Sequence, residues 1–409
     1  MSKTVIVIGG GPGGIASAVT AAENGLKVVI VDENPALGGQ IWRQQLGKVK
    51  DKNAQKWIAR LMRLDISFES SATFLGCDQG SAVCHSRSKG RFLLEYDALI
   101  LACGAKELFL PFPGWTLPNV LGCGGAQAMV KSGLNVQGKR VVVSGSGPLL
   151  LAVATYLKKN GAQIAGIYEQ AEAAKLNSLA FYLLKHFPAK ILQGISYRLN
   201  LLTVPWKKGW WVKKALGAEA LESIVVTNGS EEKKIDCDIL ACGFGLKANL
   251  EIPGILACKT SNGFVEVDEN QKTSVEGVFA VGELTGIGGL DKALLEGENA
   301  ARFISGLRSQ NKHKAAMAGF VNRLEETFAL RPEVKNLAEK TTVFCRCEDV
   351  PYSEVCDSMD QRSVKLYSRC GMGSCQGRVC STMGQELFGW DLNNIKSPLV
   401  PLNVESLMD

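Results

Sequence analysis

The chain has 409 residues, 46% hydrophobic and 21% charged. This composition excludes a disordered protein, and the length exceeds one domain of about 100–200 residues. The net charge of +6 is too weak over this length to indicate a nucleic-acid partner. No apolar stretch approaches the roughly 18–20 residues that span a bilayer, so we expect no transmembrane segment. The first residues lack a secretory signal, which favours a cytoplasmic protein with reduced thiols and leaves open peripheral association with the inner face of the membrane.

The start of the chain predicts a βαβ unit. Thr4–Ile8 and Val28–Val31 are apolar runs typical of parallel strands, and Ile15–Asn24 predicts the helix between them. The spacing G-x-G-x-x-G joins the first strand to the helix, as in sites that place a pyrophosphate at a helix N-terminus. Asp32 ends the second strand, where its carboxylate can accept a hydrogen bond from a ribose hydroxyl. The candidate residues are Gly9, Gly11, Pro12, Gly13, Gly14, Asp32 and Glu33.

Three further segments are predicted to contact the same cofactor. Glycines after the second strand let the backbone approach a pyrophosphate. An apolar strand over Leu99–Cys103 ends in a glycine, and a strand over Gly277–Val281 leads into an acid. A helix begins near Asp291, and its N-terminus can stabilise negative charge on a reduced flavin. The candidate residues are Gly38, Gly39, Gln40, Gly104, Gly282, Glu283 and Gly289.

A second βαβ unit follows 136 residues after the first, with strands predicted over Arg140–Ser144 and Gln163–Tyr168 and a helix over Leu149–Lys159. Leu150 stands where the third glycine would be, so we expect the helix to lie slightly farther from the strand. The acid of this unit favours NAD or another adenine nucleotide over NADP, and a fold that binds no nucleotide is the alternative. The candidate residues are Gly145, Gly147 and Glu169.

Other segments predict connecting structure. Alternation over Ile66–Tyr96 predicts an antiparallel meander. Aromatic and basic residues are interleaved over Trp206–Lys214, which favours a β-hairpin with Gly209 at its turn. The alternatives are a surface that binds a partner subunit, a membrane or single-stranded nucleic acid. Gly306–Lys340 predicts a connecting helix.

Six of the 13 cysteines lie in the last 65 residues. Cys345-x-Cys347 is followed after 27 residues by Cys375-x₄-Cys380, in a stretch rich in glycine. Four thiolates suit a [2Fe–2S] cluster or a zinc site. Zinc ribbons prefer C-x₂-C pairs, which are absent at these positions, so the pattern favours the cluster. Cys370 is an extra thiol that could compete, and Cys356 is expected to be packed in a helix.

These motifs resemble those of known flavoproteins. The first nucleotide segments resemble the FAD-binding half of glutathione-reductase-like proteins, although Glu283 stands for the usual Asp. CRCEDV and SRCGMGSCQGRVC resemble the [2Fe–2S] domain related to bacterioferritin-associated ferredoxin. With ALILACGAKELFLPFPGWTLPNV and VVVSGSGPLLLAVA, nearly the whole chain resembles the FAD and iron–sulfur subunits of opine oxidases, D-hydroxyproline dehydrogenases and hydrogen cyanide synthase. The resemblance implies FAD, a substrate-binding partner subunit related to D-amino-acid oxidase, and a [2Fe–2S] cluster on Cys345, Cys347, Cys375 and Cys380.

We therefore predict an α/β protein with two interleaved dinucleotide-binding domains and a small C-terminal [2Fe–2S] domain. The expected ranges are 1–118 and 244–310 for the FAD domain, 119–243 for the second nucleotide domain, 311–340 for the connecting helix, 341–395 for the cluster domain and 396–409 for a tail.

The predicted function is an electron-transfer subunit of a heteromeric flavin dehydrogenase or oxidase that acts on an amino acid or secondary amine, of the opine or hydroxyproline type. A self-contained NADH-dependent FAD/[2Fe–2S] reductase is the alternative. An iron-delivery module is a third hypothesis, which the intact FAD motifs disfavour. The sequence shows no convincing catalytic acid–base pair and no clamp for a substrate carboxylate.

Overall fold

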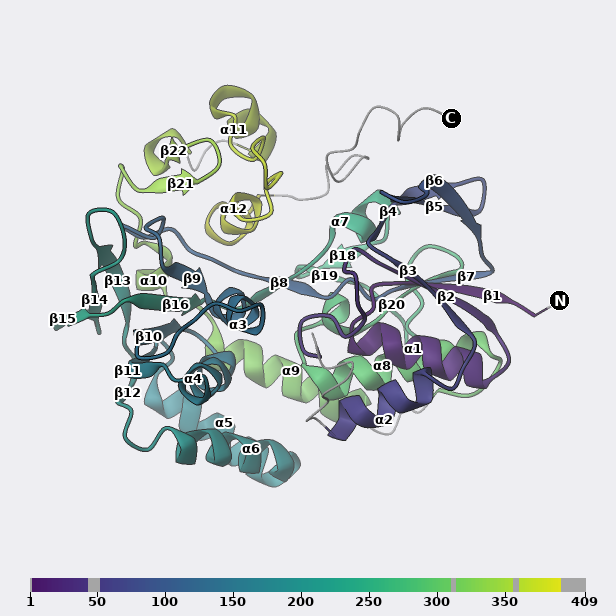
Figure 1. The fold of residues 1–409 in the computed structure, drawn as a ribbon, viewed down its shortest axis with the longest axis horizontal. Helices are drawn as coiled ribbons and strands as arrows, with labels where there is room; N and C mark the ends of the chain where they lie inside the picture. Colours follow the sequence, from purple (N-terminus) through teal and green to yellow (C-terminus); the bar gives the residue numbers. More distant parts are fainter. Residues whose placement is uncertain (1, 43–51, 310–313, 356–359, 391–409) are drawn as a thin grey trace. The chain divides into compact units, whose positions relative to one another are not determined.

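The computed structural model describes residues 2–42, 52–309, 314–355 and 360–390 (Figure 1). The chain forms two compact units, each built from separated segments. Among the described residues, unit 1 comprises those of 2–106 and 247–321, and unit 2 comprises those of Glu107–Leu246 and 322–390. The chain therefore leaves the first fold, builds the second and returns, which confirms the predicted interleaved α/β architecture. No helix of the described ranges is long and apolar enough to cross a bilayer.

A five-stranded parallel sheet forms the centre of unit 1, in the order β20-β7-β1-β2-β3. Its strands are rich in Val, Ile and Leu because a parallel sheet is covered on both faces. Val5 and Val7 face one buried cluster together with helix α1, whereas Ile6 and Ile8 face a second cluster together with β4 and β5. The strands are β1 (Thr4–Ile8), β2 (Lys27–Asp32), β3 (Ile66–Ser70), β7 (Ala98–Leu101) and β20 (Val278–Ala280).

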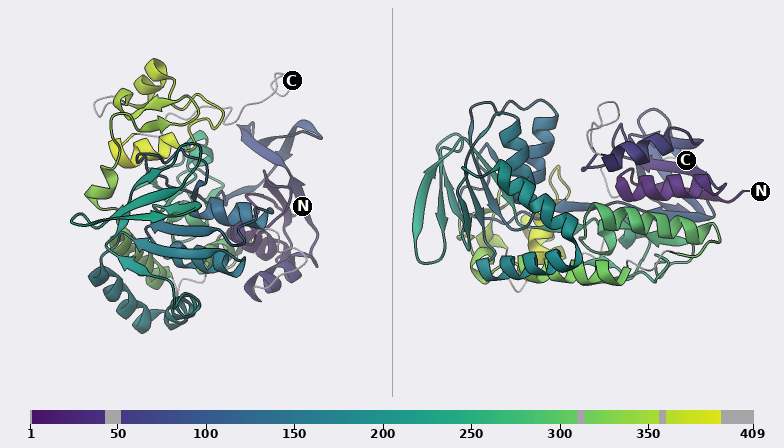
Figure 2. Two further views of the ribbon diagram at one scale, coloured as in Figure 1. Left: turned by 60° about the vertical axis from the view of Figure 1, so that its left-hand side comes forward. Right: turned by 90° about the horizontal axis from the view of Figure 1, so that it is seen from below.

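Two helices of unit 1 lie side by side, α1 (Pro12–Glu23) in purple and α8 (Leu290–Ile304) in green in the right view of Figure 2. A Cβ added at Gly297 would lie 2.3 Å from the Gly13 carbonyl oxygen, so only glycine permits this close contact. The other helices and short strands of unit 1 are α2 (Lys52–Leu61), α7 (Glu251–Ile255), η1 (Gly282–Thr285), β18 (Thr260–Ser261) and β19 (Phe264–Val265).

The meander predicted over residues 66–96 is partly wrong. β3 pairs in parallel with β2, with Val28 opposite Ile66, and so belongs to the main sheet. Only β4 (Ala72–Asp78), β5 (Ser81–Ser86) and β6 (Gly90–Glu95) form the antiparallel sheet. An alternating pattern indicates a strand with one buried face, but it does not specify the neighbouring strand.

Unit 2 contains a second parallel sheet, in the order β12-β11-β10-β16-β9, and a three-stranded antiparallel sheet, β13-β14-β15. The parallel strands are β9 (Val120–Gly122), β10 (Arg140–Gly145), β11 (Gln163–Glu169), β12 (Trp206–Lys208) and β16 (Ile239–Gly243); the antiparallel strands are β13 (Trp211–Leu216), β14 (Ser223–Thr227) and β15 (Glu232–Asp236). The helices near these sheets are α3 (Cys123–Lys131), α4 (Leu149–Lys159), α5 (Ala173–His186) and α6 (Pro188–Asn200). β8 (Ala105–Glu107) and β17 (Leu246–Ala248) carry the chain between the units.

The hairpin predicted over Trp206–Lys214 is wrong. β12 pairs in parallel with β11, whereas β13 pairs with β14. Gly209, at φ +73°, allows the chain to turn from one sheet into the other instead of folding back on itself.

The cysteine-rich segment of unit 2 shares a hydrophobic core with the second nucleotide fold. Trp115 and Phe112 lie in the same buried cluster as Phe344 and Trp390. The Trp115 indole N–H also donates a hydrogen bond to the Val343 carbonyl at 2.5 Å. The elements of this part are α9 (Lys314–Phe328), which begins in unit 1, and α10 (Pro332–Lys335), β21 (Val343–Cys345), β22 (Val350–Pro351), η3 (Tyr352–Glu354), α11 (Gln361–Ser368) and α12 (Cys380–Phe388).

Candidate flavin site and cysteine cluster

The glycines of the first loop serve two different purposes. A Cβ at Gly14 would lie 1.9 Å from the Gly9 carbonyl oxygen, and one at Gly9 would lie 2.4 Å from the Ala102 oxygen. These two glycines allow the chain to pack against itself. A Cβ at Gly11 would instead contact only Gly39 Cα, at 3.9 Å. Gly11 therefore borders open space at the N-terminus of α1, where backbone N–H groups can bind a phosphate.

Asp32, at the end of β2, is held by hydrogen bonds from Gly10 and Asn34. Its carboxylate accepts hydrogen bonds from the Gly10 N–H and from both the backbone N–H and the side-chain amide of Asn34, the last two at 2.7 Å. A carboxylate has about four lone-pair positions, so Asp32 can also accept from a ribose hydroxyl. The neighbouring Glu33 is exposed.

The segment after β2 lies against the glycine loop, as its sequence predicts. The Gly38 N–H donates to the Gly10 carbonyl at 2.8 Å. Gly39 has φ +55°, and a Cβ there would lie 2.8 Å from Gly11 Cα. These glycines let the two loops meet, whereas Gln40 is exposed.

Glu283 presents a buried acceptor that lacks a donor. It follows Gly282, which has φ +75°, and its Oε1 accepts from the Gly289 N–H at 2.9 Å. Its Oε2 is buried and has no hydrogen-bond partner among the described residues. Burial raises the pKa of the Glu283 carboxyl, and the Lys292 ammonium opposes that rise. An unsatisfied buried oxygen fits a ligand hydroxyl such as those of the ribityl chain of a flavin.

The buried ion pair beside Glu283 was not predicted from the sequence. Lys292 and Glu296 are 6% and 8% exposed, and their charged groups are 2.8 Å apart. The Lys292 ammonium also donates to the Gly282 carbonyl at 2.8 Å and to Thr285 Oγ1 at 2.6 Å. The pair therefore fixes the turn that carries Glu283. The spacing of four residues on a helix was the available signal.

Gly104 follows β7 with φ +69° and has no atom within 4 Å of an added Cβ. The Asn249 side chain donates to the Cys103 carbonyl at 2.8 Å, and the Asn249 N–H donates to the Gly104 carbonyl at 3.0 Å. Burial raises the pKa of the Cys103 thiol, and Cys242 in unit 2 is buried. Both cysteines thus suit packing rather than thiolate chemistry.

The second nucleotide loop keeps part of the pattern. A Cβ at Gly145 would lie 1.8 Å from the Gly243 oxygen, whereas Gly147 borders open space. Glu169 is 3% exposed and accepts from the N–H groups of Gly147 and Ala171, both at 2.9 Å. Burial raises the pKa of Glu169 to about 7. This loop therefore has room for a phosphate, and the chain holds both oxygens of its acid, as it does those of Asp32.

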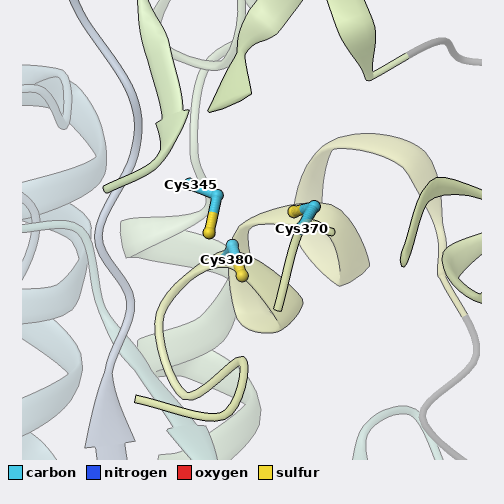
Figure 3. Close-up of side chains that lie close together, drawn as sticks. All are labelled: Cys345, Cys370 and Cys380. Carbon is cyan, nitrogen blue, oxygen red and sulfur yellow. The ribbon is translucent and has the colours of Figure 1, made fainter. Parts of the chain in front are cut away.

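Three thiols converge in the C-terminal segment (Figure 3). The sulfur atoms of Cys345, Cys370 and Cys380 lie within 4.8 Å of one another, and all three residues are buried. They come from the end of β21, the turn after α11 and the start of α12. Two of these residues, Cys345 and Cys380, are among the four predicted ligands. The third, Cys370, is the extra thiol expected to be able to compete with them.

The other two predicted ligands lie beside this group as a pair. Cys347 is exposed and Cys375 half-buried. Hydrogen bonds from the backbone and side chain of Cys375 lower the pKa of Cys347. A Cβ at Gly373 would lie 2.4 Å from Cys347 Cβ, so glycine is required beneath Cys347. Cys356 lies outside the described residues. A donor set made of thiols is compatible with an iron–sulfur cluster.

Comparison with known proteins identifies the family. The pyridine nucleotide-disulphide oxidoreductase family matches residues 3–317. The chain belongs to this family. It is therefore an FAD-dependent oxidoreductase, and the open space at Gly11 and the unpaired oxygen of Glu283 fit such a cofactor.

Relatives extend the match beyond the family segment. The chain is 29% identical to the HcnB subunit of hydrogen cyanide synthase from Pseudomonas protegens, covering 93% of this chain and 90% of that protein. It is 29% identical to an opine oxidase subunit from Rhizobium meliloti, covering 99% and 98%. Both matches confirm the resemblance drawn from the motifs. The structure of L-proline dehydrogenase from P. horikoshii shares the fold, with a TM-score of 0.69 at 20% identity over 100% of this chain and 80% of that one.

Proposed function

We propose that this chain is the electron-transfer subunit of a heteromeric flavin dehydrogenase or oxidase that acts on an amino acid or secondary amine of the opine or hydroxyproline type. The observation that carries the proposal is the presence in one chain of a flavin-type site with an unpaired acceptor on Glu283 and a group of converging thiols. The named relatives are subunits, which supports a partner. A D-amino-acid-oxidase-like flavoprotein that carries the substrate site is the proposed partner.

Each group of residues has a proposed role. The glycine loops hold the pyrophosphate of FAD, Asp32 accepts from its ribose, and Glu283 accepts from its ribityl chain. A [2Fe–2S] cluster is held by Cys345, Cys347, Cys375 and Cys380. FAD can exchange electrons in pairs or singly, whereas the cluster accepts one at a time. The Lys292–Glu296 pair keeps Glu283 in position and has its own charges paired.

A self-contained NADH-dependent reductase is the second candidate, because Gly147 borders open space as Gly11 does. The state of Glu169 argues against it. Glu169 and Asp32 both accept hydrogen bonds on both carboxylate oxygens, but burial raises the pKa of Glu169 to about 7, which weakens it as a charged acceptor for a ribose. We therefore propose NAD or another adenine nucleotide at Gly145, Gly147 and Glu169 only as a bound group that does not reduce FAD.

Anaerobic stopped-flow mixing tests the proposal. NADH alone and a secondary amino acid alone should each leave the FAD absorbance of the isolated chain nearly unchanged. With the partner and an amine substrate, the flavin should bleach first and the cluster absorbance should follow. A Cys347→Ala chain is the matched control: its flavin should still bleach, without the later cluster signal.

Two results would contradict the relay function. Flavin bleaching by NADH alone near the ~10 s⁻¹ typical of enzymes would favour the reductase. Equally fast bleaching by a secondary amino acid alone would place a substrate pocket within this chain.

A further inference from the structure

The described residues of the C-terminal segment include five cysteines, whereas a [2Fe–2S] cluster needs four ligands. Three of them converge, and the other two form a hydrogen-bonded pair beside them. The fifth thiol, Cys370, belongs to the group of three and is 5% exposed. It is therefore placed among the ligands and shielded from water.

The distances indicate how these thiols can be shared. Metal–sulfur bonds of about 2.3 Å place two thiolates on one tetrahedral metal about 3.8 Å apart. Cys345, Cys370 and Cys380 have mutual sulfur distances of 4.8 Å or less, so any two of them can meet one metal after a small movement. Each iron of a [2Fe–2S] cluster takes two protein ligands. The group of three thus offers three candidates for the two positions on one iron, and the Cys347–Cys375 pair suits the other iron.

The backbone around Cys370 favours such an exchange. Arg369 before it and Gly371 after it both have positive φ, +63° and +84°. This double turn brings Cys370 back toward α12, where a Cβ at Gly371 would lie 3.8 Å from the Cys380 sulfur. Glycine has broad conformational freedom, so the Cys370 sulfur can shift without disturbing α12.

We propose that Cys370 is a reserve ligand of the iron that Cys345 and Cys380 hold, and that it coordinates when either of them is lost. Coordination forms one iron–sulfur bond and releases the thiol proton of Cys370. The proposal rests on the [2Fe–2S] cluster of the proposed function. It makes the two halves of the ligand set unequal: the Cys345/Cys380 side tolerates a loss, and the Cys347/Cys375 side does not.

Alanine variants test this inequality, because alanine supplies no oxygen ligand in place of sulfur. The Cys345→Ala protein should retain about two irons and two sulfides per chain, with altered EPR g-values of the reduced cluster because its ligand geometry changes. The Cys345→Ala/Cys370→Ala protein should lose iron and sulfide. Cys347→Ala should lose them even with Cys370 present. Cys345→Ala/Cys258→Ala is the matched control, since Cys258 is a buried thiol of unit 1, and it should behave as Cys345→Ala.

A cluster-free Cys345→Ala protein with intact FAD absorbance and far-UV circular dichroism would overturn the proposal. Equal cluster content in the Cys345→Ala and Cys345→Ala/Cys370→Ala proteins would also overturn it. If Cys345→Ala fails to fold, Cys380→Ala with and without Cys370→Ala gives the same comparison. Absence of iron and sulfide from the unsubstituted protein, or one zinc ion in their place, would instead contradict the cluster of the proposed function.

Discussion

Replacing Glu283 with alanine should weaken FAD binding by a predictable amount. The substitution removes the Oε2 acceptor, which is buried and has no partner among the described residues. A hydrogen bond to a charged group contributes roughly 1.5–3 kcal/mol, which is about 10- to 150-fold in a dissociation constant. Glu283→Gln keeps the shape and an oxygen for the Gly289 N–H, so its loss should be smaller.

The same contact predicts a pH dependence. Burial raises the pKa of the Glu283 carboxyl above its ordinary 4.5. A ribityl hydroxyl that donates to the carboxylate stabilises the ionised form, so FAD binding should lower this pKa. By linkage, FAD affinity should therefore fall as the pH decreases through the raised pKa. Glu283→Gln should lack this acid-side decrease.

Titration of the apoprotein with FAD, followed by quenching of flavin fluorescence, measures both effects. Glu276→Ala is the matched control, because Glu276 is an exposed acid seven residues upstream and its loss should leave the dissociation constant unchanged. Our reasoning about the flavin site would be refuted if Glu283→Ala bound FAD as tightly as the unsubstituted protein across the pH range.

Three further predictions follow from contacts in each unit. Gly11→Val should give a folded apoprotein, because its side chain enters only the open phosphate space; a full flavin absorbance would contradict this. Cys375→Ala should lose iron and sulfide but keep FAD, since the flavin residues lie in unit 1 and the thiols in unit 2; parallel loss of FAD would be the contrary result. Glu169, with a pKa raised to about 7, binds its proton more tightly when folded. Stability from this group is present below pH 4.5 and lost as the pH rises through about 7, by roughly 3 kcal/mol. Denaturant unfolding at several pH values should show this decline, and Glu169→Gln should remove it; an unchanged decline in that variant would exclude Glu169 as its source.

The local elements were predictable because their signals are local. The strand Thr4–Ile8 and the helix Leu149–Lys159 have the predicted bounds, since an apolar run or periodicity beside glycine specifies them. Strand partners were less predictable. The alternating Ile66 segment joins the parallel sheet and Trp206 and Trp211 lie in different sheets, because alternation describes one strand and not its neighbour.

In the candidate site, too, the features set by nearby residues were predictable and those set by distant contacts were not. The glycine spacing and Asp32 could be recognised because one mechanism relates residues close in sequence. The two cysteine pairs indicated four ligands, and Cys370 was recognised as an extra thiol that could compete, but its approach to the group depends on positive φ at Arg369 and Gly371. Positive φ is uncommon at arginine, so sequence reasoning gave no reason to expect that turn.

Together with the proposed [2Fe–2S] cluster, the shared core of unit 2 would link iron supply to the stability of the whole unit. Phe344 and Trp390, next to the cysteine-rich elements, pack in one buried cluster with Trp115 of the nucleotide fold. Metal binding to a folded site adds to the stability of the fold that contains it. A chain synthesised without the proposed cluster would therefore have a less stable core in both the cysteine-rich part and the nucleotide fold of unit 2, and its unfolded, protease-sensitive fraction would rise. Under iron limitation, we expect cells to lose the protein itself, in addition to its ability to pass electrons.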